Sequence, residues 1–291
     1  MKRYILILAA AALAFAACSS KQENAYTPRE IKFTTTIGHF ATRATDTGFE
    51  TGDKVGVFVG DFLENVPLAW NGNELQAAST LYWPETVAGN ALVSVIAYYP
   101  YSETTSLGLW KSTVNADQST HALYTASDLM ISTNIVAPDD GPVALNFTHA
   151  LSRILLDIKS DYAIKSVYVW NVYGHFGLYN MLGVQGIDGR GTIKAGKVSL
   201  ADGSTAWACI VPPQYAAMAL VVIAEDGEEY AYLLDEEADI DLEGGMSYKA
   251  TLVIDGDTVA MDPKWDESEW TADNDVQFKD TTGEIIVEPE E

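Results

Sequence analysis

Basic residues are scarce in this sequence. Its 291 residues include 17 Lys and Arg against 41 Asp and Glu, a formal net charge of −24. Nucleic-acid ligands require clustered Lys and Arg, so this balance argues against a nucleic-acid partner. The two cysteines are too few for a disulfide scaffold or a cysteine-rich zinc module. Apolar residues make up 48% of the chain, which is enough for a full-sized core.

Long apolar runs are absent beyond the N-terminus. Residues 1–17 begin with Lys2 and Arg3, continue into an apolar stretch and end in small residues, the pattern of a secretory signal peptide. The stretch is too short to span a bilayer. Cys18 follows directly and resembles the cysteine of a bacterial lipobox. We therefore expect acyl chains on Cys18 that anchor the protein in a membrane, with residues 18–30 as a flexible tether. An ordinary signal peptide followed by a chance cysteine is the alternative.

Short strand-like runs dominate the remainder of the chain. Gly, Pro, Asn and Asp punctuate them, and helical periodicity is scarce. The pattern predicts an all-β protein with two antiparallel β-sandwich domains of Greek-key type, residues 31–150 and 151–270. The glycine-rich run 186–191 is expected to be a turn. The expected strands are 31–37, 54–59, 80–83, 91–99, 129–132, 143–149, 152–158, 165–170, 192–198, 205–211, 217–224, 230–234 and 247–254.

Acidity is concentrated towards the C-terminus. Residues 225–291 hold 23 Asp and Glu against three Lys, a net charge of −20. We expect a solvated acidic face that keeps this part of the chain soluble. Calcium binding is the alternative, but neither 255–257 nor 273–275 continues into the acidic loop formula of a calcium site.

An acidic tail, residues 271–291, follows the second predicted sandwich. Two strand-like pieces, 276–279 and 284–287, flank Asp280-Thr281-Thr282-Gly283, which has the composition of a turn. The tail fits an added hairpin, a loose end or a strand meant for a neighbouring molecule.

Catalytic and metal-binding motifs are missing. The sequence contains no HExxH, GxSxG, P-loop or dinucleotide fingerprint, and its four histidines lack ligand spacing. We therefore predict no enzyme activity, no cofactor and no metal site. His149 is expected to be a hydrogen-bonded core or interface residue, and Cys209 a buried small apolar residue. Trp265 and Trp270 are expected to pack at the end of the second sandwich, with sugar stacking as the alternative.

Several stretches together resemble the fimbrillin family of Bacteroidetes, the lipoprotein-precursor pilins and their Mfa-like relatives. The most specific stretches are Gly52-Asp53-Lys54-Val55-Gly56-Val57-Phe58 and Phe147-Thr148-His149-Ala150-Leu151-Ser152-Arg153-Ile154. Further stretches are Thr42-Arg43-Ala44-Thr45, residues 91–100, Asp128-Leu129-Met130 and Tyr248-Lys249-Ala250-Thr251-Leu252. The resemblance covers most of the chain and is firmer in the first half than in the second.

The resemblance implies an outer-membrane lipoprotein with two transthyretin-like or Ig-like sandwiches, a subunit of a surface fimbria that supports cell adhesion. In relatives an Arg-specific protease removes an N-terminal segment with the first strand, and a strand of the next subunit fills the groove. A sandwich that lacks a strand exposes unpaired backbone groups beside an apolar slot, and strand addition pairs those groups again. The implied partners are other pilin subunits, the outer membrane and the protease.

The residues that these steps would use can be named in this sequence. Arg43 lies in a polar, Thr-rich segment suited to proteolysis, and Arg29 is a second candidate. The removable first strand is expected to bury alternate residues, which are Ile31, Phe33 and Thr35. The candidate donor strand lies in the tail, and its apolar residues are Val276, Phe278, Ile285 and Val287. A plain surface arginine and a tail packed on its own chain are the alternatives.

Two other functions stay open on the sequence alone. One is a surface lipoprotein that binds glycans and does not polymerise, which exposed tryptophans lining one cleft would favour. The other is a secreted hydrolase, which two facing carboxylates, one with a raised pKa, would favour. A groove covered by a weakly held terminal strand would favour the fimbrial subunit. The sequence does not distinguish a stalk, tip or anchor role.

Overall fold

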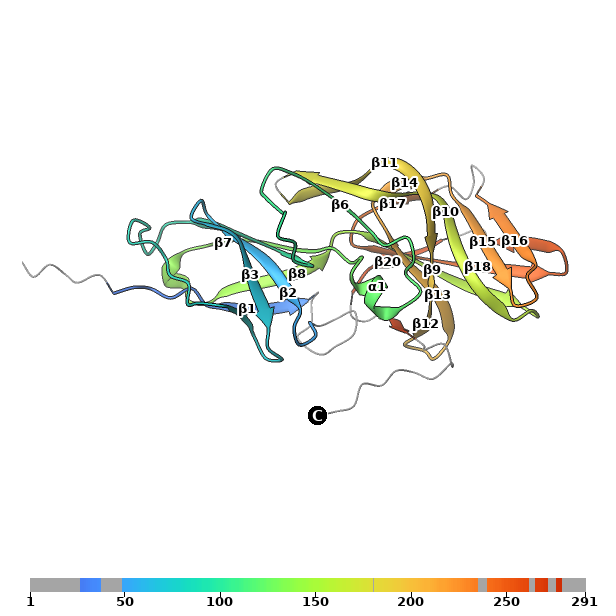
Figure 1. Ribbon diagram of the computed structural model, residues 1–291, viewed down its shortest axis with the longest axis horizontal. Helices are drawn as coiled ribbons and strands as arrows, with labels where there is room; N and C mark the ends of the chain where they lie inside the picture. Colours follow the sequence, from blue (N-terminus) through green and yellow to red (C-terminus); the bar gives the residue numbers. More distant parts are fainter. Residues whose placement is uncertain are drawn as a thin grey trace, which may run out of the picture.

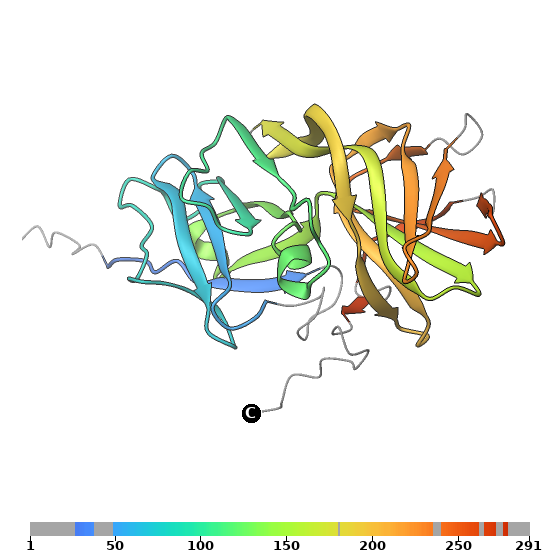
Figure 2. The same cartoon turned by 45° about the vertical axis from the view of Figure 1, so that its right-hand side comes forward.

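The computed structural model describes residues 27–37, 49–179, 181–234, 240–261, 265–271 and 276–278. Most of these residues lie in β-strands, and the helical elements among them are α1 (His121–Thr125) and the 3₁₀ turn η1 (Pro138–Asp140). Figures 1 and 2 show two β lobes side by side, which confirms the all-β expectation. Within the described residues, no helix has the length and apolar character that crossing a membrane requires.

The first lobe is one seven-stranded sheet with the strand order β1-β8-β7-β5-β2-β3-β4. Its strands are β1 (Phe33–Ile37), β2 (Lys54–Val59), β3 (Leu63–Trp70), β4 (Leu75–Ala77), β5 (Val93–Tyr99), β7 (Met130–Val136) and β8 (Val143–His149). The sheet folds over on itself, so that its edge strands β1 and β4 approach each other around an apolar core. Fully buried members of this core are Val57, Leu68, Val95 and Leu145.

The second lobe packs a five-stranded and a seven-stranded sheet against each other. The first sheet has the order β11-β10-β15-β16, with β6 also paired to β10. Its strands are β6 (Leu109–Thr113), β10 (Ile164–Tyr179), β11 (Leu182–Lys194), β15 (Ala219–Ala224) and β16 (Glu229–Leu233). The second sheet has the order β19-β18-β9-β13-β12-β21, with β20 also paired to β18. Its strands are β9 (Ser152–Ser160), β12 (Gly196–Leu200), β13 (Thr205–Val211), β18 (Met246–Asp255), β19 (Thr258–Met261), β20 (Asp266–Glu269) and β21 (Val276–Phe278). A short ribbon joins β14 (Gln214–Ala216) to β17 (Ile240–Leu242).

Strand β2 explains the residue pattern of the motif around Gly56. Val55 and Val57 are fully buried in the core of the first lobe, whereas Phe58 belongs to the core that continues into the second lobe. Gly56 lies opposite Tyr98 of β5, and a Cβ at Gly56 would come within 2.2 Å of the Tyr98 ring. The alternating side chains of β2 therefore serve two cores, and the glycine leaves room for the tyrosine.

The two lobes are not two consecutive stretches of chain. After β5 the chain crosses to the second lobe, where β6 pairs with the far end of β10, and it returns to the first lobe in β7. Trp110 of β6 explains this crossing, because its ring centroid lies 5.5 Å from that of Tyr98 and 6.0 Å from that of Phe176. Strand β6 thus belongs structurally to the second lobe, although it lies within residues 31–150.

The prediction of a turn at the glycine-rich run 186–191 is wrong. These residues form the middle of β11, paired along its length with β10. Gly186 packs against Tyr173 of β10, since a Cβ at Gly186 would lie 3.0 Å from that side chain. Asp188 takes a φ of 60° in the stretch where the register between the two strands shifts. The small residues therefore allow the long hairpin to bulge and bend without ending the strand.

Two strand pairs depart from the expected antiparallel arrangement. Strand β1 pairs with β8 in parallel, and β9 pairs with β18 in parallel. Both pairs join strands that are distant in sequence, so no short turn requires the two chains to run in opposite directions.

Candidate functional site

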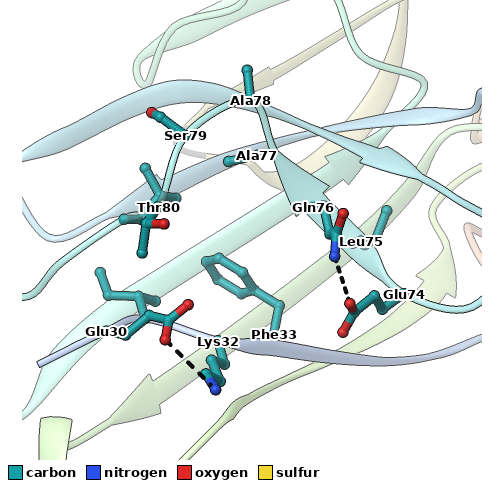
Figure 3. Close-up of a pocket in the computed structure, with 12 residues that line it drawn as sticks. Glu30, Lys32, Phe33, Glu74, Leu75, Gln76, Ala77, Ala78, Ser79 and Thr80 are labelled. Carbon is teal, nitrogen blue, oxygen red and sulfur yellow. Dashed lines mark hydrogen bonds and ion pairs between the residues drawn. The ribbon is translucent and has the colours of Figure 1, made fainter.

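A groove opens between the two edge strands of the first lobe. At one end, the segment before β1 is joined to the segment after β4, where Ile31 N donates to Leu81 O and Trp83 N donates to Arg29 O, both at 2.9 Å. Strands β1 and β4 then continue without pairing with each other. The groove between them has a volume of about 450 Å³ and is drawn in Figure 3. Its lining includes Glu30, Lys32, Phe33, Leu75, Gln76 and Thr80.

The first strand and the residues just before it form one wall of this groove and bury two apolar side chains. Ile31 is 5% exposed and Phe33 8% exposed, whereas Lys32 and Thr34 are exposed and Thr35 is half-buried. Within the described residues, β1 pairs with β8 alone, over five residues and in parallel. Parallel pairing is slightly less stable per residue than antiparallel pairing. The candidate removable strand is therefore a short edge strand with few contacts.

The side chain of Arg29 is engaged by its neighbours. Its guanidinium pairs with Asp139 of η1 at 3.1 Å (Nη1 to Oδ1) and also donates to the carbonyl oxygen of Val87. Its backbone carbonyl accepts the hydrogen bond from Trp83. A protease requires an accessible, extended chain around the scissile bond. These contacts hold both the side chain and the backbone of Arg29 in the folded protein.

The described part of the tail is bound to its own chain. Strand β21 pairs antiparallel with β12, and its Val276 and Phe278 are 2% and 6% exposed. A Cβ at Gly196 would come within 2.3 Å of the Phe278 ring, and the ring centroids of Phe278 and Tyr124 lie 5.0 Å apart. Residues 276–278 therefore pair with the second lobe of their own chain, which is the alternative of a tail packed on its own chain.

The remaining candidate residues lie outside the described residues. They are Cys18, Arg43, Ile285 and Val287. Their roles stay predictions from the sequence.

Strand β4, in the opposite wall of the groove, was not among the expected strands. Leu75 of β4 follows the turn Asn71-Gly72-Asn73, in which Asn71 Oδ1 accepts the backbone N–H groups of Asn73 and Glu74 at 2.9 Å. An Asn-Gly pair between two apolar runs is a strong hairpin signal. That dipeptide could have located β3, β4 and therefore the groove.

Comparisons with known proteins decide the family. The model of the fimbrillin-like family matches residues 42–265 of this sequence. The chain belongs to the fimbrillin-like family. This confirms the resemblance drawn from the motifs. No curated protein matches the sequence.

Solved structures share the fold of this fimbrillin-like chain. A proposed cell adhesion protein from Bacteroides uniformis has a TM-score of 0.64 at 23% identity, over 84% of this chain and 99% of that one. A proposed cell adhesion protein from Bacteroides ovatus has a TM-score of 0.67 at 17% identity, over 85% and 99%. A fimbrial protein from Bacteroides vulgatus has a TM-score of 0.50 at 11% identity, over 84% and 100%. At these identities the likeness establishes the fold.

A buried polar cluster lies where the two lobes of this fimbrillin-like chain meet. His149 Nδ1 lies 2.9 Å from Asp128 Oδ2, and both side chains are almost fully buried. The His149 ring stacks on Trp270, with 3.8 Å between centroids and 1° between planes. These contacts confirm the prediction of a hydrogen-bonded interface histidine. Trp270 is buried, as expected for packing, so Trp265 and Trp270 do not form an exposed platform for a sugar.

The titratable side chains of the fimbrillin-like chain bear on the alternative function of a hydrolase. No group of three or more His, Cys, Asp or Glu residues within the described part of the chain could hold a metal ion. The pKa values of Asp117 and Asp202 are lowered, because the hydroxyls of Ser119 and Ser204 donate to these carboxylates. A hydrolase acid would need a raised carboxyl pKa instead. Burial raises the pKa of the Cys209 thiol to about 12, which confirms that it is a buried apolar residue.

Proposed function

We propose that this protein is a structural subunit of a bacterial surface fimbria, joined to its neighbours by strand exchange, and that it supports cell adhesion. It reaches the outer membrane as a lipoprotein through Cys18 and has no enzymatic role. It serves as a stalk, tip or anchor component, and its partners are other pilin subunits and an Arg-specific protease. Membership of the fimbrillin-like family and the arrangement of the two chain ends support this proposal.

The observation that carries the proposal is the position of the first strand. Strand β1 lies at a sheet edge, pairs in parallel with β8 and borders an open groove. Its removal would leave the edge of β8 unpaired and would empty the sites of Ile31 and Phe33. Unpaired buried backbone groups cost about 1–3 kcal/mol each. An incoming strand that pairs antiparallel with β8 would restore these bonds in a slightly more stable geometry.

The tail supplies side chains of a matching kind. Val276 and Phe278 of β21 repeat the spacing of Ile31 and Phe33, with one polar residue between each pair. Ile285 and Val287 have the same spacing further along the tail. The pairing of β21 with β12 is then the state before exchange, in which the donor residues are covered by their own chain.

Cleavage after Arg43 is the processing step that we propose. Arg43 follows β1 in the sequence, so this cut would release the whole strand, whereas Arg29 precedes it. The contacts of Arg29 with Asp139 and with Trp83 argue against the alternative cut.

Limited proteolysis tests the proposal. The protein without residues 1–18 is incubated with an Arg-specific protease, and its size is followed by light scattering and electron microscopy. We expect a discrete cut after Arg43 and then filaments. Arg43→Ala should remain uncut and monomeric, and Arg29→Ala should behave like the parent. A product that is cut after Arg43, has lost β1 and stays monomeric at high concentration would overturn strand exchange.

A further inference from the structure

The chain passes from the first lobe to the second through a very short joint. Strand β8 ends at His149 and β9 begins at Ser152. Each lobe contributes one backbone hydrogen bond to the two residues between them. Ala150 N donates to Leu129 O, and Gly245 N donates to Leu151 O, both at 2.8 Å. The joint is thus held from both sides.

Five polar and aromatic residues surround this joint, and we call them the joint cluster. They are Asp128, His149, Arg153, Ser247 and Trp270. All five are buried, and Arg153 has no exposed surface at all. Asp128 and His149 lie on the first-lobe side of the joint. Arg153 lies in β9, Ser247 in β18, and Trp270 directly after β20, all in the second lobe.

Trp270 makes contacts to both ends of the joint. Its ring stacks on His149 at 3.8 Å, and the guanidinium carbon of Arg153 lies over the same ring, 4.9 Å from the centroid. Its backbone N–H donates to Gly245 O at 2.7 Å, and Gly245 in turn donates to Leu151. The Trp270 ring therefore contacts His149 before the joint and Arg153 at the start of β9, and the Trp270 backbone holds the loop at Gly245.

Gly244 and Gly245 allow their loop to lie close to the joint. A Cβ at Gly244 would lie 2.5 Å from the carbonyl oxygen of Ala150, and Gly245 has a φ of 79°. The partners of Trp270 are themselves fixed. His149 is hydrogen-bonded to Asp128, and Arg153 Nε donates to Ser247 Oγ at 3.1 Å.

The indole of Trp270 is held by packing of its ring and not by a hydrogen bond. Its Nε1 is buried and has no hydrogen-bond partner among the described residues. Ring stacking and contact with a cation are the interactions that remain, and both depend on a flat aromatic face. A phenylalanine would keep that face, whereas a leucine would not.

We propose that Trp270 is the anchor that keeps the joint between the lobes rigid, and that it marks the point beyond which the tail can leave the body of the protein. The second part rests on the proposed function. Trp270 is the last member of the joint cluster, and among the described residues beyond it β21 is held by β12 and Tyr124. The tail can therefore detach from the second lobe while the orientation of the lobes is preserved.

Two truncations that differ by one residue test this assignment. One protein ends at Trp270 and the other at Glu269, so both lack β21. Amide hydrogen exchange of Ala150 and Gly245 is measured on the unprocessed monomer, where no step of fimbria assembly enters the result. We expect exchange within about twofold of the full chain in the longer protein and at least about tenfold faster in the shorter one.

Substitutions in the full chain separate anchoring from general stability. Trp270→Phe should keep slow exchange at Ala150 and Gly245, and Trp270→Leu should lose it. Trp83→Leu is the matched control, because Trp83 is equally buried but lies in the core of the first lobe. In the Trp83→Leu protein the free energy of unfolding should fall, but hydrogen exchange at Ala150 and Gly245 should not become selectively faster. Equal exchange in both truncations, fast exchange in both, or a Trp83→Leu pattern identical to that of Trp270→Leu would each overturn the proposal.

Discussion

The first strand, supplied as a separate peptide of residues 27–37, is expected to bind a protein that begins at residue 49. The shortened protein loses Ile31 and Phe33 from its first core, where they are 5% and 8% exposed. Burial of a large apolar side chain contributes about 1.5–3 kcal/mol, so the two together contribute about 3–6 kcal/mol. This is a large part of the roughly 5–15 kcal/mol that stabilises a typical domain. The first lobe should therefore melt early and recover when the peptide is added.

Peptides with single substitutions measure how much each side chain of the first strand contributes to binding. Truncation of a buried Phe to Ala costs about 3–5 kcal/mol, and we take the lower value because β1 is an edge strand. A Phe33→Ala peptide should then bind about 100-fold more weakly, since every 1.4 kcal/mol is about tenfold. Lys32 is exposed, and its ion pair with Glu30 is at the surface. A Lys32→Ala peptide should therefore bind within about threefold of the parent.

Fluorescence anisotropy of labelled peptides measures these affinities, and thermal unfolding of the shortened protein measures the recovery. The contrast between the two neighbouring substitutions is the decisive readout, because nonspecific adhesion of an apolar peptide would not depend on the alternation of β1. Equal affinities for the Phe33→Ala and Lys32→Ala peptides would refute the reasoning. So would a first lobe that is equally stable without the strand.

Four further outcomes are expected. Gly56→Ala should lower the free energy of unfolding by about 1–3 kcal/mol through overpacking against Tyr98, and a Tyr98→Leu background should relieve most of this loss in urea titrations. Phe278→Ala should increase hydrogen exchange in β12 without unfolding the first lobe. Cys18→Ala should abolish incorporation of labelled palmitate and move the protein out of the membrane fraction. Burial raises the pKa of the Cys209 thiol from 9.0 to about 12, so between these pH values the unfolded chain binds fewer protons than the folded chain. The free energy of unfolding should therefore fall by about 1.4 kcal/mol for each unit by which the pH rises in this interval. The fall should be shallower in Cys209→Ala.

Strands with clear local patterns were predicted well. The expected ranges 143–149 and 205–211 coincide with β8 and β13. In β8 burial alternates along the whole strand, and β13 is an almost continuous buried run between turns. The long strands β10 and β11 were missed over half their length. Their glycines resemble turn residues, and only contact with Tyr173 on the neighbouring strand shows that Gly186 is a packing residue.

The candidate site was predicted in part. The alternation of Ile31 and Phe33 with exposed residues is a local property, and the structure places both in the core. The opposite wall at Leu75 and the parallel pairing with Val143 are contacts between distant parts of the chain. Periodicity carries no information about which distant strands meet. For the same reason the stacking of Trp270 on the ring of His149 could not be derived from the spacing of the tryptophans.

The two chain ends differ from the rest of the molecule in how they are held. Within the described residues, β1 pairs on one side over five residues and β21 on one side over three, whereas β9 pairs over five residues with β13 and over eight with β18. Short edge elements with few buried contacts open at the lowest cost in free energy. The proposed strand exchange would need β1 to leave the acceptor groove and β21 to leave its own chain, and both are short edge strands. With Trp270 as the proposed anchor of the joint, opening of β1 or β21 would not require the lobes to separate.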